Sequence, residues 1–383
     1  MKRGYYIQIL IIIALCISCK DRYYPEINGP ETGYLVVEGT LNAGNAATSL
    51  LLSRTTAVNG SRGRSPVLNA RIAVEGSDNS VLQLPMSTPG NYENTLQLSA
   101  GNRYRIRINT TDGKEYLSDF VPVKITPAID SIGFKESEKG VQLYVNTHDP
   151  ANSTIYYRWD FDETWEINSY YQSMLIYDPK SPDADEAGVR NRIFPREDVF
   201  ACWKYGRSSG IYIGNSAKLT SDVIFQQPLN LIAAGDDRLS VKYSILLRQY
   251  AMDKAAYEFY DLMKKNTESI GDIFGPLPSE LRGNIHCTTN PGEIVIGYIS
   301  ATVPTQKRVF INRPAGWKFG QLCEIQFVLQ NKDSTFEAFS AGATIPISNT
   351  TRDFFTEGYS AAMATCVDCT TRGGKVQKPS YWP

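Results

Sequence analysis

Histidine is scarce in this chain of 383 residues, which contains only His148 and His286. Neither lies near a Gly-x-Ser-x-Gly elbow, and no glycine-rich phosphate loop precedes a helical pattern. The net charge is −1, so the chain lacks the basic excess of a general nucleic-acid surface. These absences argue against a serine hydrolase, a nucleotide-phosphate enzyme and a nucleic-acid partner. We predict a non-enzymatic protein with no catalytic residue, metal or cofactor.

Long apolar runs are also lacking beyond the N-terminus. The run at residues 7–17 follows two basic residues, Lys2 and Arg3. A membrane-spanning helix needs roughly 20 apolar residues, whereas this run has the length of a signal-peptide core. We therefore predict cleavage of a signal peptide at residues 1–18.

The residues around the cut predict a lipid anchor. Ser18 supplies the small residue that a signal peptidase requires, and Cys19 follows it. Two or three acyl chains anchor a protein stably where one does not. Ordinary cleavage without a lipid is the alternative, because Cys16 stands where an aliphatic residue is usual. We expect lipidation at Cys19, a lipidated tether at 19–33, and a lipid-anchored protein of the outer membrane at the cell surface.

From residue 34 the sequence alternates with the period of a β-strand. Short β-branched runs are separated by Gly, Asn, Pro and Asp, and Asp112-Gly113 predicts a two-residue hairpin turn. Many short strands without a helical run are typical of an immunoglobulin-like β-sandwich, which we place at residues 34–127. Three arginines, Arg103, Arg105 and Arg107, share one strand face. That face is either a solvated side of the sheet or a basic ligand-binding stripe.

Residues 128–383 predict a larger β-rich domain with one main α-helix and a cysteine-containing C-terminal tail. The helix is expected near residues 253–270, where apolar residues recur at helical spacing and Asp253 can serve as cap. Residues 179–192 are polar and predict an exposed insertion. The fold class is therefore mainly β, with an immunoglobulin-like sandwich before the larger domain.

One acidic run is a candidate for chemistry. Asp160, Asp162, Glu163 and Glu166 alternate with aromatic residues. A calcium site or a glycosidase pair would use such carboxylates. The alternation instead favours a strand with its aromatic side chains toward the core.

Five cysteines follow Cys19 in the chain. They are candidates for disulfides, because an exported chain meets an oxidising compartment: Cys202, Cys287, Cys323, Cys366 and Cys369. Five thiols form at most two bridges and leave one over. The Cys-x-x-Cys pair at 366 and 369 lacks the second pair of a structural zinc site. A tail disulfide, for which Cys323 is one candidate partner, is favoured over a metal.

The order of several short motifs resembles one known family. The motifs are Tyr34-Leu35-Val36-Val37-Glu38-Gly39, Asp112-Gly113-Lys114-Glu115-Tyr116, Ile129-Asp130-Ser131-Ile132, the run at 159–166, Cys202-Trp203, Tyr243-Ser244, Gln249-Tyr250, Gly283-Asn284-Ile285, Gly297-Tyr298, Cys366-x-x-Cys369, Gly373-Gly374 and Lys378-Pro379. Together they resemble the domain-of-unknown-function 4249 lipoprotein family over nearly the whole mature chain. Cys16 and Cys287 depart from its pattern, which leaves the disulfide partners open.

This resemblance implies an outer-membrane lipoprotein associated with TonB-dependent receptors of the starch-utilisation-like class. It implies no catalytic residues. The first hypothesis is thus an accessory subunit of a TonB-dependent transporter, with the receptor barrel as partner and an unknown small-molecule, glycan or peptide ligand. The alternative is a structural or adhesive surface lipoprotein. A secreted hydrolase that uses Asp160, Asp162 or Glu163 is the third reading.

Overall fold

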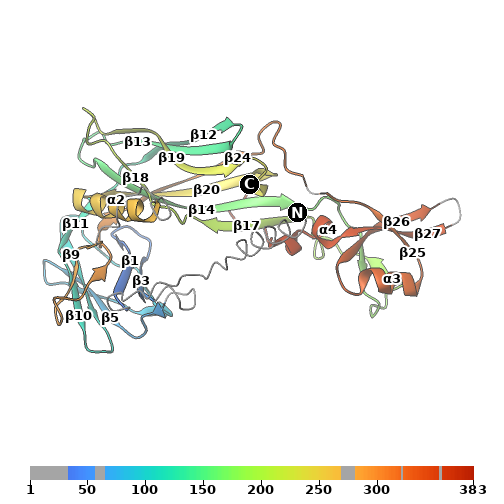
Figure 1. Cartoon of the computed structure of the whole chain (residues 1–383), viewed down its shortest axis with the longest axis horizontal. Helices are drawn as coiled ribbons and strands as arrows, with labels where there is room; N and C mark the ends of the chain where they lie inside the picture. The colour runs from blue at the N-terminus through green and yellow to red at the C-terminus, as the bar shows by residue number, and fades with distance from the viewer. Residues whose placement is uncertain (1–32, 57–64, 269–280, 321, 353–355) are drawn as a thin grey trace, which may run out of the picture.

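The computed structural model describes residues 33–56, 65–268, 281–320, 322–352 and 356–383. It is mainly β, as predicted, and forms an elongated molecule of three parts (Figure 1). We name these parts by the residues that build them: the N-terminal sandwich (33–127 and 283–303), the central sandwich (128–169, 199–268 and 304–319) and the C-terminal lobe (170–198 and 322–368).

Two sheets face each other in the N-terminal sandwich. The first contains β22 (Val295–Ile296), β1 (Leu35–Gly39), β3 (Thr48–Arg54), β8 (Asn91–Asn94) and β7 (Met86–Thr88) in this order, with β4 (Ser65–Pro66) beside β3. The second contains β2 (Leu41–Asn42), β23 (Ala301–Val303), β11 (Val121–Ile125), β9 (Arg103–Asn109), β10 (Glu115–Ser118) and β21 (Ile285–Cys287), with β5 (Arg71–Gly76) on β9 and β6 (Val81–Leu84) on β5. Strand alternation forms the core: Tyr104, Ile106 and Ile108 of β9 are buried while the arginines between them point outward.

The N-terminal sandwich is discontinuous in sequence, which differs from the expected boundaries of 34–127. β22 pairs in parallel with β1, and β23 pairs in parallel with both β2 and β11. Ile285, Val295 and Ile299 are buried in the same apolar core as Leu35. Short strands are not stable unless they pair and pack with others. Residues 283–303 therefore belong to the N-terminal sandwich, although the sequence places them within the second predicted domain.

The central sandwich is built around the longest strand of the chain. β14 (Tyr156–Asn168) pairs with β20 (Lys242–Met252) over eleven residue pairs. The five-stranded sheet is completed by β17 (Ala201–Arg207), β18 (Tyr212–Asn215) and β24 (Thr305–Asn312), and it packs on a three-stranded sheet of β12 (Ile129–Ser137), β13 (Gly140–His148) and β19 (Val223–Ala233). A short 3-10 helix, η1 (Asp237–Leu239), precedes β20.

The main helix is α2 (Lys254–Glu268), and the sequence predicted it within two residues at each end. Asp253 caps it, since its carboxylate accepts a hydrogen bond from the Ala256 N–H at 2.7 Å. Phe259 packs against Tyr298 of the N-terminal sandwich. The helix therefore lies at the junction of the two sandwiches (Figure 1). In the described residues no helix is long and apolar enough to cross a membrane.

The C-terminal lobe was not predicted as a separate part. It contains β15 (Leu175–Tyr177), β16 (Val189–Asn191), β25 (Gln326–Leu329), α3 (Lys332–Phe339), β26 (Thr344–Arg352), β27 (Thr356–Met363) and α4 (Ala364–Val367). Ala187 and Val189 are buried against Phe339 and Tyr359. The segment 179–192, predicted as an exposed insertion, thus supplies part of this small core. The reason is long-range: its apolar partners come from residues 328–361.

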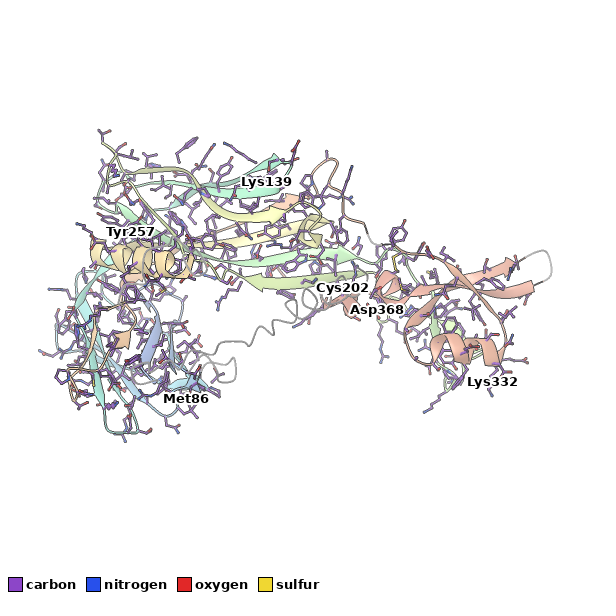
Figure 2. The ribbon with its side chains drawn as sticks, in the orientation of Figure 1. Met86, Lys139, Cys202, Tyr257, Lys332 and Asp368 are labelled. Carbon is purple, nitrogen blue, oxygen red and sulfur yellow. A yellow bond between two sulfur atoms is a disulfide. The ribbon has the colours of Figure 1, made fainter. Side chains whose placement is uncertain are left out.

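Two disulfides secure the lobe and the tail. Cys323 bonds to Cys366 within the lobe, and Cys202 of β17 bonds to Cys369 of η2 (Cys369–Arg372). Cys202 and Asp368 mark this junction in Figure 2. Cys287 is buried and free.

Candidate functional site

A cleft of about 1470 Å³ lies between the N-terminal and central sandwiches. One wall comes from β1 to β3 and β8, including Thr40, Asn42 and Asn91. The other comes from β14, β18, β20 and α2, including Arg158, Arg248 and Tyr260. Ligand pockets in proteins typically measure about 300–1000 Å³. The cleft is therefore large enough for a ligand of several linked residues.

The central wall carries a row of charged side chains because of strand register. Arg158, Asp160 and Asp162 alternate on β14, and Tyr250 and Arg248 stand opposite the first two on β20. Residues directly opposite in an antiparallel pair point to the same face. The intervening Trp159 and Phe161 point to the core and are buried. One face of β14 thus supports the central sandwich while the other lines the cleft.

Arg248 is neutralised within the wall. Its Nε lies 2.5 Å from Asp160 Oδ1, and its Nη1 lies 2.6 Å from Asp162 Oδ2. A second contact joins Nη2 to Asp162 Oδ1 at 3.1 Å. This forked pairing holds both carboxylates in fixed positions. Burial alone would lower the pKa of the Arg248 guanidinium, but its bonds to Asp160 and Asp162 outweigh burial and raise this pKa above its usual value.

Arg158 lies between two aromatic rings. Its guanidinium carbon is 4.3 Å from the ring centre of Tyr250 and 5.2 Å from that of Tyr260. Such cation–π contacts fix the plane of the guanidinium. Burial, followed by the charge of Asp160, raises the pKa of Tyr250 to about 12. Its hydroxyl therefore stays protonated at neutral pH.

The predicted acidic cluster does not assemble into one site. Asp160 lines the cleft and Asp162 lies on the same strand face, both in ion pairs with Arg248, whereas Glu163 points the other way into the central core. Its Oε1 accepts hydrogen bonds from Tyr243 Oη at 2.6 Å, Asn230 Nδ2 at 3.1 Å and Arg238 Nη1 at 3.2 Å. The expected orientation of the aromatic residues holds for Trp159 and Phe161, while Trp165 is only half-buried.

The predicted basic stripe is the arginine face of β9. Arg105 and Arg107 form ion pairs with Glu75 at 2.8 and 2.6 Å, and Arg107 also pairs with Glu115. Arg103 instead donates a hydrogen bond from Nη2 to the Phe120 carbonyl oxygen at 2.7 Å. Two of the three arginines are therefore neutralised by carboxylates, so the face does not present a stripe of three unpaired cations.

The cysteine candidates form no metal centre in the described residues, where no group of three or more His, Cys, Asp or Glu side chains could hold an ion. Four of the five are in the two disulfides, and Cys287, the last residue of β21, is buried opposite Tyr116 of β10. Cys19, its tether up to residue 32 and the signal peptide lie outside the described residues.

Sequence reasoning missed Arg158, Tyr250, Tyr260 and Thr40. The first three stand within predicted strands or the predicted helix, so their local structure was foreseen. The contact between these residues was not foreseen, because it depends on the register of two strands about 90 residues apart and on the packing of α2. The one available signal was the spacing of two residues between Arg158, Asp160 and Asp162, which puts their side chains on one face of a strand.

The sequence profile described as "Domain of unknown function (DUF4249)" matches residues 20–308, which span both sandwiches and end before most of the C-terminal lobe. No curated protein matches the chain. Among solved structures, a two-domain fibronectin type III segment of chicken tenascin matches with 11% identity over 57% of this chain and 91% of its own, with a TM-score of 0.16.

The adhesin InvE of Yersinia pseudotuberculosis matches with 9% identity over 85% of this chain and 73% of its own, with a TM-score of 0.15. The family profile, in contrast, covers about three quarters of the sequence. The chain belongs to the DUF4249 family, a family defined by a domain of unknown function.

Proposed function

We propose that this protein is a non-enzymatic lipoprotein of the outer membrane that captures a ligand for a TonB-dependent transporter. The observation that carries the capture role is the cleft between the two sandwiches, with its fixed arginines and tyrosines. The location rests on the signal sequence and on Cys19. The transporter as partner rests on the family resemblance.

The geometry of the acidic run favours binding over catalysis. A glycosidase places two carboxyl groups about 5–10 Å apart on either side of one sugar bond. Here Glu163 is on the opposite face of the sheet from Asp160 and Asp162. Asp160 and Asp162 share Arg248. Each is held as an ion-pair partner, so neither is poised as a general acid.

Affinity purification from solubilised outer membranes tests this proposal. A tag fits the exposed turn at Asp183 better than the C-terminus, because Trp382 is buried against Trp203 and Phe310. We expect a transporter barrel in the eluate, and its loss with the Cys19→Ala variant. Repeated absence of any barrel protein with the wild-type chain would contradict the proposal.

A structural or adhesive role is the second candidate. Its support is the set of exposed large apolar side chains on β19 and the C-terminal lobe, which includes Phe225, Leu322 and Phe336. Exposed apolar patches often mark contact surfaces. A deletion strain that takes up nutrients normally but loses attachment would favour this role over transport.

A further inference from the structure

Arg158 and Arg248 both line the central wall of the cleft, but Arg158 uses fewer of its hydrogen-bond donors. A guanidinium has five N–H donors. Within the described residues Arg158 donates one hydrogen bond, from Nη2 to Thr40 Oγ1 at 3.3 Å. Its nearest carboxylate, Asp160, is 3.9 Å from Nη1. Arg248, by comparison, makes three short bonds to two carboxylates.

The two tyrosines hold this arginine in place without using its donors. The Arg158 guanidinium carbon lies over both rings, and neither contact uses an N–H donor in a hydrogen bond. The Arg158 side chain is 20% exposed, and it lines the cleft. A planar fork held in this way matches the two oxygens of a carboxylate. Pre-organisation also lowers the entropy lost on binding.

The surrounding charges limit the ligand to a low negative charge. Three arginines line the cleft, and the three carboxylates of Glu38, Glu93 and Asp160 balance them. A polyanion would meet no net positive lining. A phosphate dianion would also lie close to Asp160, which is 3.9 Å from the Arg158 guanidinium. A single carboxylate suits this site better.

The rest of the lining indicates the body of the ligand. Amide and hydroxyl side chains from both walls face the cleft: Asn42, Asn45, Ser49, Asn91, Ser208 and Ser209. Such groups pair with the hydroxyls of a sugar or the amides of a peptide. The cleft volume of about 1470 Å³ accommodates several linked residues.

We propose that the cleft binds a polar oligomer through one carboxylate that pairs with the fork of Arg158. This inference deepens the proposed capture role and rests on it. The carboxylate can come from an acidic sugar or from the C-terminus of a peptide. Both sources offer the same planar oxygen pair.

Calorimetric binding to the mature protein in detergent tests the inference without any transporter. Two acids with one carboxylate each are compared with counterparts that lack it: 3′-sialyllactose with 3′-galactosyllactose, and trialanine with its C-terminal amide. We expect at least one acid to bind at least tenfold tighter than its counterpart. The acid that binds identifies the source of the carboxylate.

Variants then assign the contact to Arg158. Arg158→Gln should weaken acid binding at least tenfold, and Arg158→Lys should weaken it less, because lysine keeps the charge but loses the fork. Arg103→Gln, on an exposed arginine outside the cleft, is the matched control and should leave affinity unchanged. Thermal unfolding of each variant shows that it is folded.

Three results overturn the inference: equal affinity for each acid and its neutral counterpart, no binding of either acid at millimolar concentration, or inorganic phosphate that binds more tightly than both acids. If an acid binds but no barrel is recovered, the Arg158 site is supported and the transporter partner is contradicted. If a barrel is recovered but acids are not preferred, the transporter partner is supported and the Arg158 site is contradicted.

Discussion

Gly283 passes so close to Gly297 that a methyl group on Gly283 would overlap the Gly297 carbonyl oxygen. Gly297 in turn has a φ of +154° and leaves no room for a side chain beside the Val37 carbonyl. These two close approaches bring residues 283–303 against β1. They allow a segment from the second half of the sequence to complete the N-terminal sandwich.

Gly283→Ala should therefore destabilise the protein. Backbone atoms cannot move aside as a side chain does, so we expect a loss of about 2–3 kcal/mol in the free energy of unfolding. Urea denaturation gives this value. Gly101→Ala is the matched control, because nothing lies within 4 Å of the added methyl group. Equal stability of the two variants would contradict the close approach.

Removal of the long-range disulfide should loosen the tail. Cys202 and Cys369 are 167 residues apart in sequence, whereas Cys323 and Cys366 are 43 apart. In the chain-entropy account, closure of the longer loop contributes about 5 kcal/mol and closure of the shorter loop about 4 kcal/mol. The double variant Cys202→Ser/Cys369→Ser should lose more stability than Cys323→Ser/Cys366→Ser in oxidised thermal unfolding. Cys287→Ala, at the free thiol, serves as control.

The disulfide prediction also has a local readout. Lys375 pairs with Trp203 next to the Cys202–Cys369 bond. Limited proteolysis should cut the tail beyond residue 372 faster in the first double variant than in the second. Equal cleavage rates would show that the packing of Trp382 alone holds the tail.

Asp149 should make stability depend on acid pH. Its buried carboxylate accepts hydrogen bonds from Ala151, Ser153 and Thr154 at 2.9–3.0 Å. Burial alone would raise the pKa of Asp149, but the backbone bonds from Ser153 and Ala151 and the hydroxyl bonds lower it to about 2. The unfolded value is about 3.9.

The sign of this effect follows from the depressed pKa. The stabilisation, about 2–3 kcal/mol, is complete above about pH 4 and is lost as the pH falls toward 2. Asp149→Asn should lower stability at pH 7 and flatten the pH dependence between 4 and 2, as measured by urea unfolding across that range. Asp183→Asn, on an exposed carboxylate, should change neither quantity.

Glu163 should act on stability. Its carboxylate is buried and accepts hydrogen bonds from Tyr243, Asn230 and Arg238. Glu163→Gln leaves the Arg238 charge with Asp236 alone, so we expect a loss of about 2–4 kcal/mol. Glu186→Gln, on an exposed side chain, is the control for urea unfolding. A hydrolytic activity that disappears in Glu163→Gln while stability is unchanged would contradict this structural role.

Local sequence signals predicted much of the fold. A hairpin joins β9 to β10 at Asp112-Gly113, as predicted, but its turn is not the expected two-residue type. Gly113 has a φ of +83°, whereas Asp112 is not among the residues with positive φ, and the Gly113 N–H donates to the Thr110 carbonyl oxygen. The helix expected at 253–270 is α2, and Asp253 caps it. These features depend on residues within a few positions of one another. The periodicity of a single sequence is sufficient to find them.

The candidate site depends on contacts that periodicity does not contain. Arg158 meets Tyr250 through strand register, and Thr40 comes from another part of the chain. The return of residues 283–303 and the separate C-terminal lobe are long-range in the same sense. Sequence reasoning therefore identified the strands but not the cleft that they form together.

The proposed place in the cell depends on Cys19, and the mass of the N-terminal peptide tests it most directly. The mature protein is extracted from membranes, digested and analysed by mass spectrometry. Our account predicts a chain that begins at Cys19 and carries acyl chains on it. A chain that begins at another residue, or an unmodified Cys19, would contradict the lipid anchor and the transport role proposed with it.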